Sequence, residues 1–252
     1  MLETLWLAWH YKEKSLNLPS SFKLSDHSLQ LWYARVGDES KIVEQATEKL
    51  LSPSEKKRFQ STKSNKKRRE FLLSRALMRH ALDLTFPDQK NEWEFVEHHN
   101  SIPEINKLPG NAFLSLSHSN GLICFTIANY PVGVDLEMNK QRDFIELAKV
   151  FMNDEEHADL VNRVRSTKEL AKTFYQNWCA KEAYYKAISK TDQPSINLKN
   201  ISISDLADQY KNWFLLEWEI EQFIIAVVIE EEPVEIRHHH FLSTNQIIKT
   251  IT

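Results

Sequence analysis

The chain has 252 residues, and at about 150 residues per domain this length predicts one or two domains that bury a core without disulfides. Its 32 lysines and arginines against 35 acids give a net charge of −3, which excludes the global positive field of a non-specific nucleic-acid binder. Only four glycines occur, the nearest two being Gly110 and Gly121, 121 − 110 = 11 positions apart. This spacing excludes the glycine-rich loops that bind dinucleotides and nucleoside triphosphates.

Several other site classes are excluded in the same way. No histidine precedes a glutamate, and the two cysteines lie 179 − 124 = 55 positions apart, so any metal is held by oxygen. The amino terminus carries an early acid and no basic region, and the longest apolar run, 223–229, is too short for a membrane helix. We therefore expect a cytoplasmic protein without a membrane partner. The histidines at 238–240 are interpreted as a solvated segment in preference to a metal site.

The first half of the chain predicts a strand, three helices and three further strands. A strand at 29–36 precedes a helix at 42–51, a short basic helix that Ser52 caps with Pro53 at its first position, and an amphipathic helix at 66–84. Strands follow at 92–97, 112–117 and 122–129, the last two joined by a hairpin turn at 118–121.

The second half repeats this order. It predicts a strand at 132–138, helices at 144–151, 153–156 and 167–188, and strands near 200–204, 213–220 and 223–229. Residues 51–55 match 151–155 at an offset of 100, and 71–79 match 178–186 at an offset of 107, which pairs Arg75 with Glu182. Chance similarity of amphipathic helices is the alternative. We predict an α+β fold of two pseudosymmetric halves, 1–129 and 130–252, each a small antiparallel sheet packed with a long helix.

Two carboxylates converge on the predicted strand at 132–138. Asp135 and Glu137 are two positions apart, so both side chains leave one face of the strand. Neighbouring like charges are costly unless a cation lies between them, and oxygen ligands without histidine or cysteine favour Mg²⁺. The alternative is the exposed polar face of an edge strand.

Polar residues on neighbouring elements add to this pair. Glu182 and Lys186 are four positions apart on the long helix, where a surface ion pair is the simplest interpretation. Ser117 and His118 end a strand, and His118 alone would be a turn histidine. Residues 55–70 carry eight cations and two glutamates, a charge of 8 − 2 = +6 that suits phosphates, an acidic protein or a solvated helix face.

Together these pieces resemble a known family. The chain resembles the 4′-phosphopantetheinyl transferases of the Sfp type in the order of three motifs. These motifs are Ser117-His118, then Gly133-Val-Asp-Leu-Glu137, then Trp178-Cys-Ala-Lys-Glu-Ala-Tyr-Tyr-Lys186. Each motif is weak alone, whereas their order and the 182 − 137 = 45 residues between the acidic pieces are specific. The resemblance covers residues 52–229 and implies two pseudosymmetric halves with the active site at their interface.

The activity that the resemblance implies is transfer of the phosphopantetheine arm of coenzyme A to a serine of an apo acyl or peptidyl carrier protein, with release of 3′,5′-ADP. It implies Mg²⁺, which would neutralise the pyrophosphate, with Asp135, Glu137 and Glu182 as its ligands. It also implies catalytic roles for Glu182, Lys186 and Glu156. Glu156, or the adjacent Glu155, would act as a base near the attacking serine.

Coenzyme A would contact Ser117, His118, Lys181 and Lys186, with His118 on the 3′-phosphate. Members of the family often carry Gly-Lys-Pro before the Ser-His strand, but residues 99–103 here are His-Asn-Ser-Ile-Pro, so that lysine is missing. The candidates to replace it are Lys63, Lys66, Arg69 and Arg75. Of these we predict Arg75.

Two other functions are weighed against the transferase. One is a non-catalytic scaffold that docks an acidic carrier through the basic block, which the intact acids at 135, 137 and 182 argue against. The other is a nucleic-acid binder, for which only Phe59 and Phe71 supply aromatic rings near the block. We therefore expect a monomer that binds no nucleic acid, and Mg²⁺-dependent binding of coenzyme A distinguishes the transferase from both alternatives.

Overall fold

The computed structural model describes residues 27–37, 41–90, 92–98, 102–163, 166–207 and 212–241. Its first elements are β1 (Ser28–Arg35), α1 (Lys41–Leu50), α2 (Pro53–Ser61), α3 (Asn65–Thr85), η1 (Pro87–Gln89), β2 (Phe95–Val96), β3 (Glu104–Ile105), β4 (Phe113–Ser119) and β5 (Leu122–Ala128). They are followed by β6 (Val132–Met138), α4 (Phe144–Phe151), α5 (Asp154–Arg163), α6 (Thr167–Ala187), η2 (Gln193–Ser195), η3 (Leu198–Asn200), α7 (Ile203–Ala207), β7 (Trp213–Ile220), β8 (Phe223–Glu230) and β9 (Glu235–Phe241).

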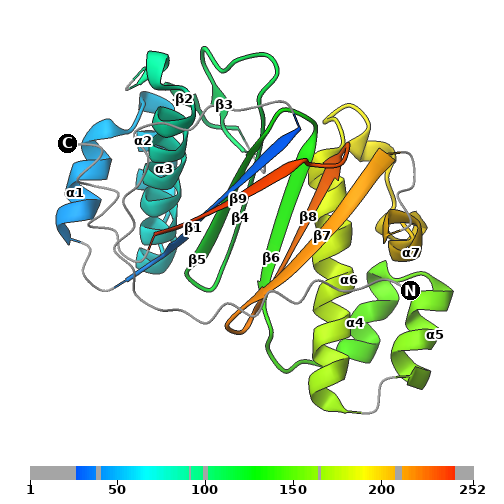
Figure 1. Ribbon diagram of the computed structural model, residues 1–252. Coiled ribbons are helices and arrows are strands. Elements are labelled where there is room, and N and C mark those ends of the chain that lie inside the picture. Colours follow the sequence, from blue (N-terminus) through cyan, green and yellow to red (C-terminus); the bar gives the residue numbers. More distant parts are fainter. Residues whose placement is uncertain are drawn as a thin grey trace.

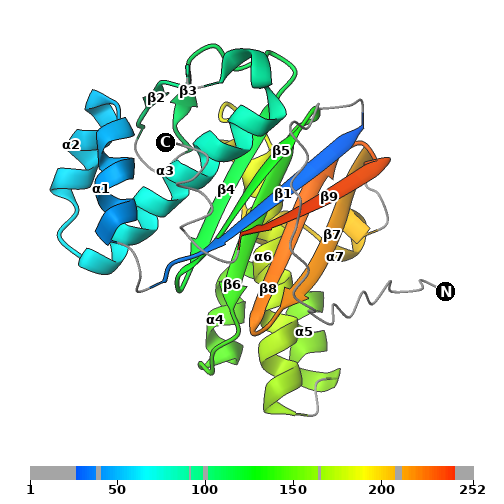
Figure 2. The ribbon, with the colours of Figure 1, turned by 60° about the vertical axis from the view of Figure 1, so that its left-hand side comes forward.

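Two sheets pack face to face, and the two longest helices cover their outer sides (Figures 1 and 2). The strand orders are β4-β5-β1-β9 and β6-β8-β7. Apolar side chains such as Leu31, Val134 and Val227 form the core between the sheets. α3 packs on the outer side of the first sheet and α6 on that of the second. The predicted α+β class is confirmed, and the layers run helix, sheet, sheet, helix.

The connectivity of the two sheets repeats. The orders β4-β5-β1 and β7-β8-β6 use corresponding elements, and every neighbouring pair in them is antiparallel. β9 is the exception, since it joins the first sheet and runs parallel to β1. A division of the chain after residue 129 therefore leaves one strand of the first sheet in the second half of the sequence.

The offset between the two long helices differs from the predicted one. α3 and α6 both have 21 residues and are both capped by a serine, Ser64 and Ser166. Their offset is therefore 167 − 65 = 102, not 107. The short helices also shift, because Ser52 with Glu55 and Asn153 with Glu156 form equivalent caps 153 − 52 = 101 positions apart. The predicted match of Arg75 with Glu182 is wrong.

Local signals placed most elements within one or two residues. The turn between β4 and β5 has positive φ at Asn120 and Gly121, the conformation that a tight two-residue hairpin requires. The strand predicted near 200–204 is wrong, because η3 and α7 occupy this region. None of the described helices is long and apolar enough to cross a membrane.

The histidine-rich segment is a strand, which corrects its interpretation as a solvated segment. In β9, the ring of His239 stacks on Trp32 with centroids 3.8 Å apart, and the ring of His238 lies 5.2 Å from that of Trp218. His80 of α3 meets Trp32 edge-on from 5.8 Å. His239 therefore packs β9 onto the first sheet, His80 packs α3 onto the same tryptophan, and the exposed His238 contacts Trp218 of the second sheet.

Acidification from pH 6.5 to pH 4 will destabilise the fold through His80 and His239. Burial lowers the pKa of both imidazoles to about 4, assisted by Lys90 at His80 and by Arg237, His238 and His80 at His239. Between these pH values the unfolded chain binds protons that the folded protein does not, so the free energy of unfolding decreases as the pH falls. The expected loss is about 3 kcal/mol for each histidine.

Urea unfolding at pH 6.5 and pH 4 measures this loss. Replacing both residues, His80→Gln with His239→Gln, should reduce the difference between the two pH values. The control is His98→Gln, because the His98 side chain is 44% exposed. A double variant that keeps the parent's pH dependence would contradict the assignment.

Candidate active site between the two sheets

Serine side chains of β4 join the two sheets at the position of the predicted site. Ser115 Oγ accepts the N–H of Val134 at 3.0 Å, and Ser117 Oγ accepts that of Leu136 at 3.2 Å. β6 is an edge strand of its sheet, so the N–H groups on its outer edge have no neighbouring strand to bind. The serine side chains of β4 accept hydrogen bonds from two of these N–H groups. Since side chains alternate along a strand, His118 points to the opposite face, where Leu114 and Leu116 pack toward α3.

Asp135 is the centre of a buried polar cluster. Its Oδ1 accepts hydrogen bonds from Ser117 Oγ at 2.9 Å and from Lys186 Nζ at 2.6 Å. Lys186 also donates to the carbonyl oxygen of Val134 at 3.2 Å. Burial acts to lower the pKa of Lys186, but Asp135, with help from Glu182, raises it above the ordinary value. Lys186 is therefore held as a cation beside the carboxylate.

Two further carboxylates lie close enough to interact with Asp135. Burial raises the pKa of Glu182, and the charges of Asp135 and Glu137 raise it further against the opposing charge of Lys186. Burial and Asp135 also raise the pKa of Glu137, against a hydrogen bond that Ser119 Oγ donates to its Oε2 at 2.7 Å. β4, β6 and α6 thus bring Ser117, Asp135, Glu137, Glu182 and Lys186 together, as predicted.

The donor set fits a hard divalent cation. Asp135 Oδ2 is buried without a hydrogen-bond partner in the described part of the chain, and an anionic oxygen in that state favours a positive ligand. Every nearby acidic donor is a carboxylate oxygen, the type that Mg²⁺ prefers. Among the described residues, no three His, Cys, Asp or Glu side chains are already arranged as a metal cluster.

His118 lies on the face of β4 opposite to Ser117, beside a glutamate that the sequence did not single out. Glu70 of α3 accepts the N–H of Gly121 at 3.1 Å, and its second oxygen is 4.0 Å from His118 Nδ1. Burial lowers the pKa of His118, and the nearby cations Lys186, Arg75 and Arg58 lower it further, while Glu70 acts in the opposite direction. The imidazole is 54% exposed, so a ligand can reach it.

The structure does not bring Lys181 and Glu156 to the cluster. The Lys181 side chain is fully buried, and its Nζ donates to Glu156 at 2.5 Å and to the carbonyl oxygens of Phe151 and Leu198 at 3.0 and 3.1 Å. All three ammonium protons are therefore used inside the protein. Glu156 also accepts the N–H groups of Asn153 and Ile203, so its carboxylate ties three elements together.

The same ion pair occurs in the first half. There Arg79 of α3 donates two hydrogen bonds to Glu55, at 2.6 and 3.0 Å, and Glu55 caps α2 as Glu156 caps α5. Arg79 and Lys181 are equivalent at the offset of 102. This repetition indicates a structural role for Lys181 and Glu156, which corrects their assignment to ligand binding and proton transfer.

Arg75 is also engaged within the protein. Its side chain is 3% exposed and pairs with Glu97, while Glu55 lies 3.6 Å from its Nε. The predicted contact with coenzyme A thus needs Glu97 to give way. Of the other candidates, Lys63 and Lys66 are exposed and Arg69 pairs with Glu44 at 2.8 Å. The segment that replaces Gly-Lys-Pro is 99–103, and its residues 99–101 lie outside the described residues.

The carboxylates occur in only one of the two halves. Trp32 pairs with Phe125 and Asp135 with Ala226, and 226 − 125 = 101 is also the offset of the two hairpins. Trp32 therefore occupies in the first half the position of Asp135, and at the helix offset His80 occupies that of Glu182. Aromatic packing fills the equivalent place, so the polar cluster is unique among the described residues.

The geometry agrees with comparisons to known proteins. A sequence model of the 4′-phosphopantetheinyl transferase superfamily matches residues 131–235, the stretch that carries Asp135, Glu137, Glu182 and Lys186. The chain is therefore similar to the 4′-phosphopantetheinyl transferase superfamily over this stretch. It is 27% identical to 4′-phosphopantetheinyl transferase Sfp of Bacillus subtilis over 203 residues, which cover 73% of this chain and 88% of that protein.

Two further relatives match over shorter stretches. The transferase gsp of Aneurinibacillus migulanus is 33% identical over 76 residues, 30% of this chain and 31% of its own length. The transferase psf-1 of Bacillus pumilus is 29% identical over 122 residues, 48% of this chain and 51% of its own length. The resemblance to the 4′-phosphopantetheinyl transferases that the sequence motifs indicated is confirmed.

Proposed function

We propose that the chain transfers the 4′-phosphopantetheine arm of coenzyme A to a serine hydroxyl of an apo carrier protein and releases 3′,5′-ADP. The observation that carries this proposal is the buried cluster of Asp135, Glu137 and Glu182 with Lys186, in which Asp135 Oδ2 has no partner among the described residues. A pyrophosphate needs positive charge where it is broken. The similarity to the superfamily supports this substrate class.

Asp135, Glu137 and Glu182 would hold Mg²⁺. When bound, the ion neutralises charge on the pyrophosphate. In the reaction the serine oxygen bonds to the phosphorus that carries the pantetheine arm, the anhydride bond to 3′,5′-ADP breaks, and the hydroxyl proton leaves. We assign the acceptance of this proton to Glu182, because Glu156 is held by Lys181 and backbone N–H groups and Glu155 is exposed.

Lys186 positions Asp135 in this proposal. Its ammonium group bonds Oδ1 and leaves Oδ2 free toward the place of the ion. Ser117 donates to the same oxygen and fixes the strand that bears His118. We further propose that the enzyme is cytoplasmic. We also propose that it acts as a monomer, because one chain supplies β4 from its first half and β6 and α6 from its second.

Mass spectrometry tests the proposal directly. The protein is incubated with coenzyme A, Mg²⁺ and a panel of apo acyl and peptidyl carriers, and the expected result is a carrier that gains the phosphopantetheine arm. The Asp135→Asn variant serves as the negative control. A protein that neither binds coenzyme A in the presence of Mg²⁺ nor modifies any carrier would instead support a carrier-docking scaffold.

Replacing His118 with alanine should weaken coenzyme A binding about tenfold, the usual scale of a lost charge-assisted hydrogen bond. Binding of 3′-dephospho-coenzyme A should change little, because only the contact with the 3′-phosphate is lost. Calorimetry with both ligands measures the two effects. Equal weakening toward both ligands would remove His118 from the 3′-phosphate, and His98→Ala is the control for loss of an exposed imidazole.

A further inference from the structure

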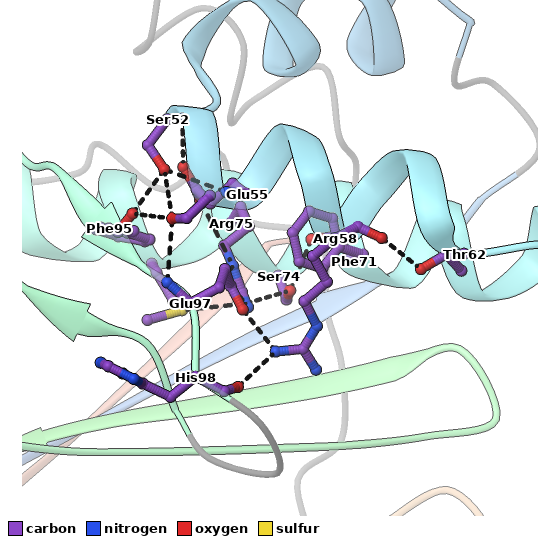
Figure 3. Close-up of polar contacts among 12 residues, drawn as sticks. Ser52, Glu55, Arg58, Thr62, Phe71, Ser74, Arg75, Phe95, Glu97 and His98 are labelled. Atoms are coloured by element: carbon purple, nitrogen blue, oxygen red, sulfur yellow. Dashed lines mark hydrogen bonds and ion pairs between the residues drawn. The ribbon is translucent and has the colours of Figure 1, made fainter.

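Two arginines of the first half converge on a single buried carboxylate. Glu97, directly after β2, accepts hydrogen bonds from Arg75 Nε on Oε1 at 2.7 Å and from Arg58 Nη1 on Oε2 at 2.5 Å, and Arg75 Nη2 forms an ion pair with Oε1 at 2.5 Å (Figure 3). The Glu97 side chain is only 6% exposed. Both guanidinium groups also lie over the ring of Phe71, at 5.8 and 4.5 Å from its centre.

The guanidinium groups of Arg58 and Arg75 form an anion-binding site, which we call the seat. Two planar guanidinium groups that close on the oxygens of one group are the usual way in which proteins hold a phosphate. The seat belongs to the same electrostatic region as His118, because the charges of both arginines act on that imidazole. Here the anion in the seat is the protein's own carboxylate.

The three arginines around the seat already pair with carboxylates of the protein. Arg58 and Arg75 pair with Glu97, and Arg79 pairs with Glu55. A phosphate at His118 therefore meets arginines that already have partners. Arg58 is nevertheless 43% exposed, so it can turn to a ligand if Glu97 releases it.

We propose that Glu97 is an internal competitor of the ligand phosphate: it occupies the seat formed by Arg58 and Arg75 and weakens recognition of the 3′-phosphate of coenzyme A. Glu97 is then a specificity-determining residue, and the parent protein discriminates less between coenzyme A and its 3′-dephospho form than free arginines would allow. The identity of the ligand rests on the proposed function.

The variant Glu97→Gln tests this inference. Its amide oxygen still accepts a bond from Arg75, and Arg75 keeps Glu55 at 3.6 Å, so we expect the fold to survive. Arg58 gains the freedom to bind the ligand. Calorimetry in the presence of Mg²⁺ should show coenzyme A bound about tenfold more tightly and 3′-dephospho-coenzyme A unchanged. Adding Arg58→Gln should abolish the gain.

The matched control is Glu104→Gln. Glu104 is 67% exposed on β3 and pairs with His98, so the same charge is removed nearby without touching the arginines. An equal gain for both ligands, or no gain in a folded Glu97→Gln protein, would overturn the inference.

A second variant covers the case in which Glu97→Gln does not fold. Arg58→Gln alone should leave coenzyme A affinity unchanged, because Arg58 is already paired with Glu97. A clear loss of affinity would contradict the proposed competition between Glu97 and the ligand phosphate. The proposed function is judged separately: a parent that binds no coenzyme A refutes it, whereas a parent that transfers the arm leaves only the role of Glu97 in question.

Discussion

Replacing Glu182 with glutamine will lower the rate of phosphopantetheine transfer by about 10² to 10³, the effect of losing one preorganised electrostatic group. The substitution keeps the shape of the side chain and removes a charge that lies with Asp135 and Glu137 in one buried cluster. Because the three carboxylates repel one another without a cation, the variant should fold and be as stable as the parent in the absence of Mg²⁺, or slightly more stable.

Two measurements separate this role from that of a surface ion pair. Single-turnover transfer gives the rate, and thermal unfolding with and without Mg²⁺ gives the stabilisation by the ion, which should be smaller in the variant. An ordinary pair of Glu182 with Lys186 would cost a few tenths of a kcal/mol (~0.3) and no activity. Near-parental transfer with unchanged Mg²⁺ dependence would exclude Glu182 from the site.

The control substitution is Glu169→Gln. Glu169 lies in the first turn of the same helix and is exposed, so it reports on the loss of an acid from α6 away from the cluster. Its transfer rate should equal that of the parent.

The central part of the fold could be predicted from local patterns. β6, α4 and β7 have the predicted bounds, because the apolar alternation or helical spacing in each is clean and turn residues flank it. The convergence of Asp135 with Glu137 followed from the period of a strand, and their meeting with Glu182 followed from the family resemblance. Ser115 and Ser119, which also bind β6 or its carboxylate, were visible as alternate serines but carried no recognised motif.

Non-local pairing accounts for what was missed. β9 pairs with β1 from more than 200 positions away, Ser28 facing Glu235, and its histidines resemble solvated polar residues until Trp32 is placed against them. Residue similarity between 71–79 and 178–186 predicts an offset of 107 between the long helices. The serine caps, which fix where each helix begins, give 102. The burial of Lys181 is equally non-local, since its ammonium group is satisfied by carbonyl groups of other elements.

Glu97 and Glu70 illustrate a further limit. Neither residue belongs to a motif, and the sequence does not predict their partners because their contacts join separate elements. Glu97 follows β2 and binds arginines of α2 and α3. Glu70 joins α3 to the turn between β4 and β5. The sequence predicted Arg75 as the replacement for the missing lysine of the Gly-Lys-Pro triplet. Its availability depends on these carboxylates.

Replacing Gly133 with alanine will disrupt the contact between β6 and α6. A Cβ at this position would lie 1.8 Å from the carbonyl oxygen of Ala183 and 2.6 Å from the backbone nitrogen of Ala187. Both atoms belong to the helix backbone, which cannot rotate away as a side chain could, so strand and helix must separate. Overpacking of a core by one methyl costs about 1–3 kcal/mol, and a clash with two backbone atoms should exceed that range.

The activity of this variant should fall further than its stability explains, because β6 carries Asp135 and Glu137 and α6 carries Glu182 and Lys186. Urea unfolding gives the loss of stability, and transfer is measured at a low temperature where the variant is folded. The matched control is Gly110→Ala, which meets no atom within 4 Å and should match the parent in both assays. A folded Gly133→Ala protein with parental stability would show that β6 and α6 do not approach as closely as the structure places them, and the geometry of the carboxylate cluster would have to be revised with them.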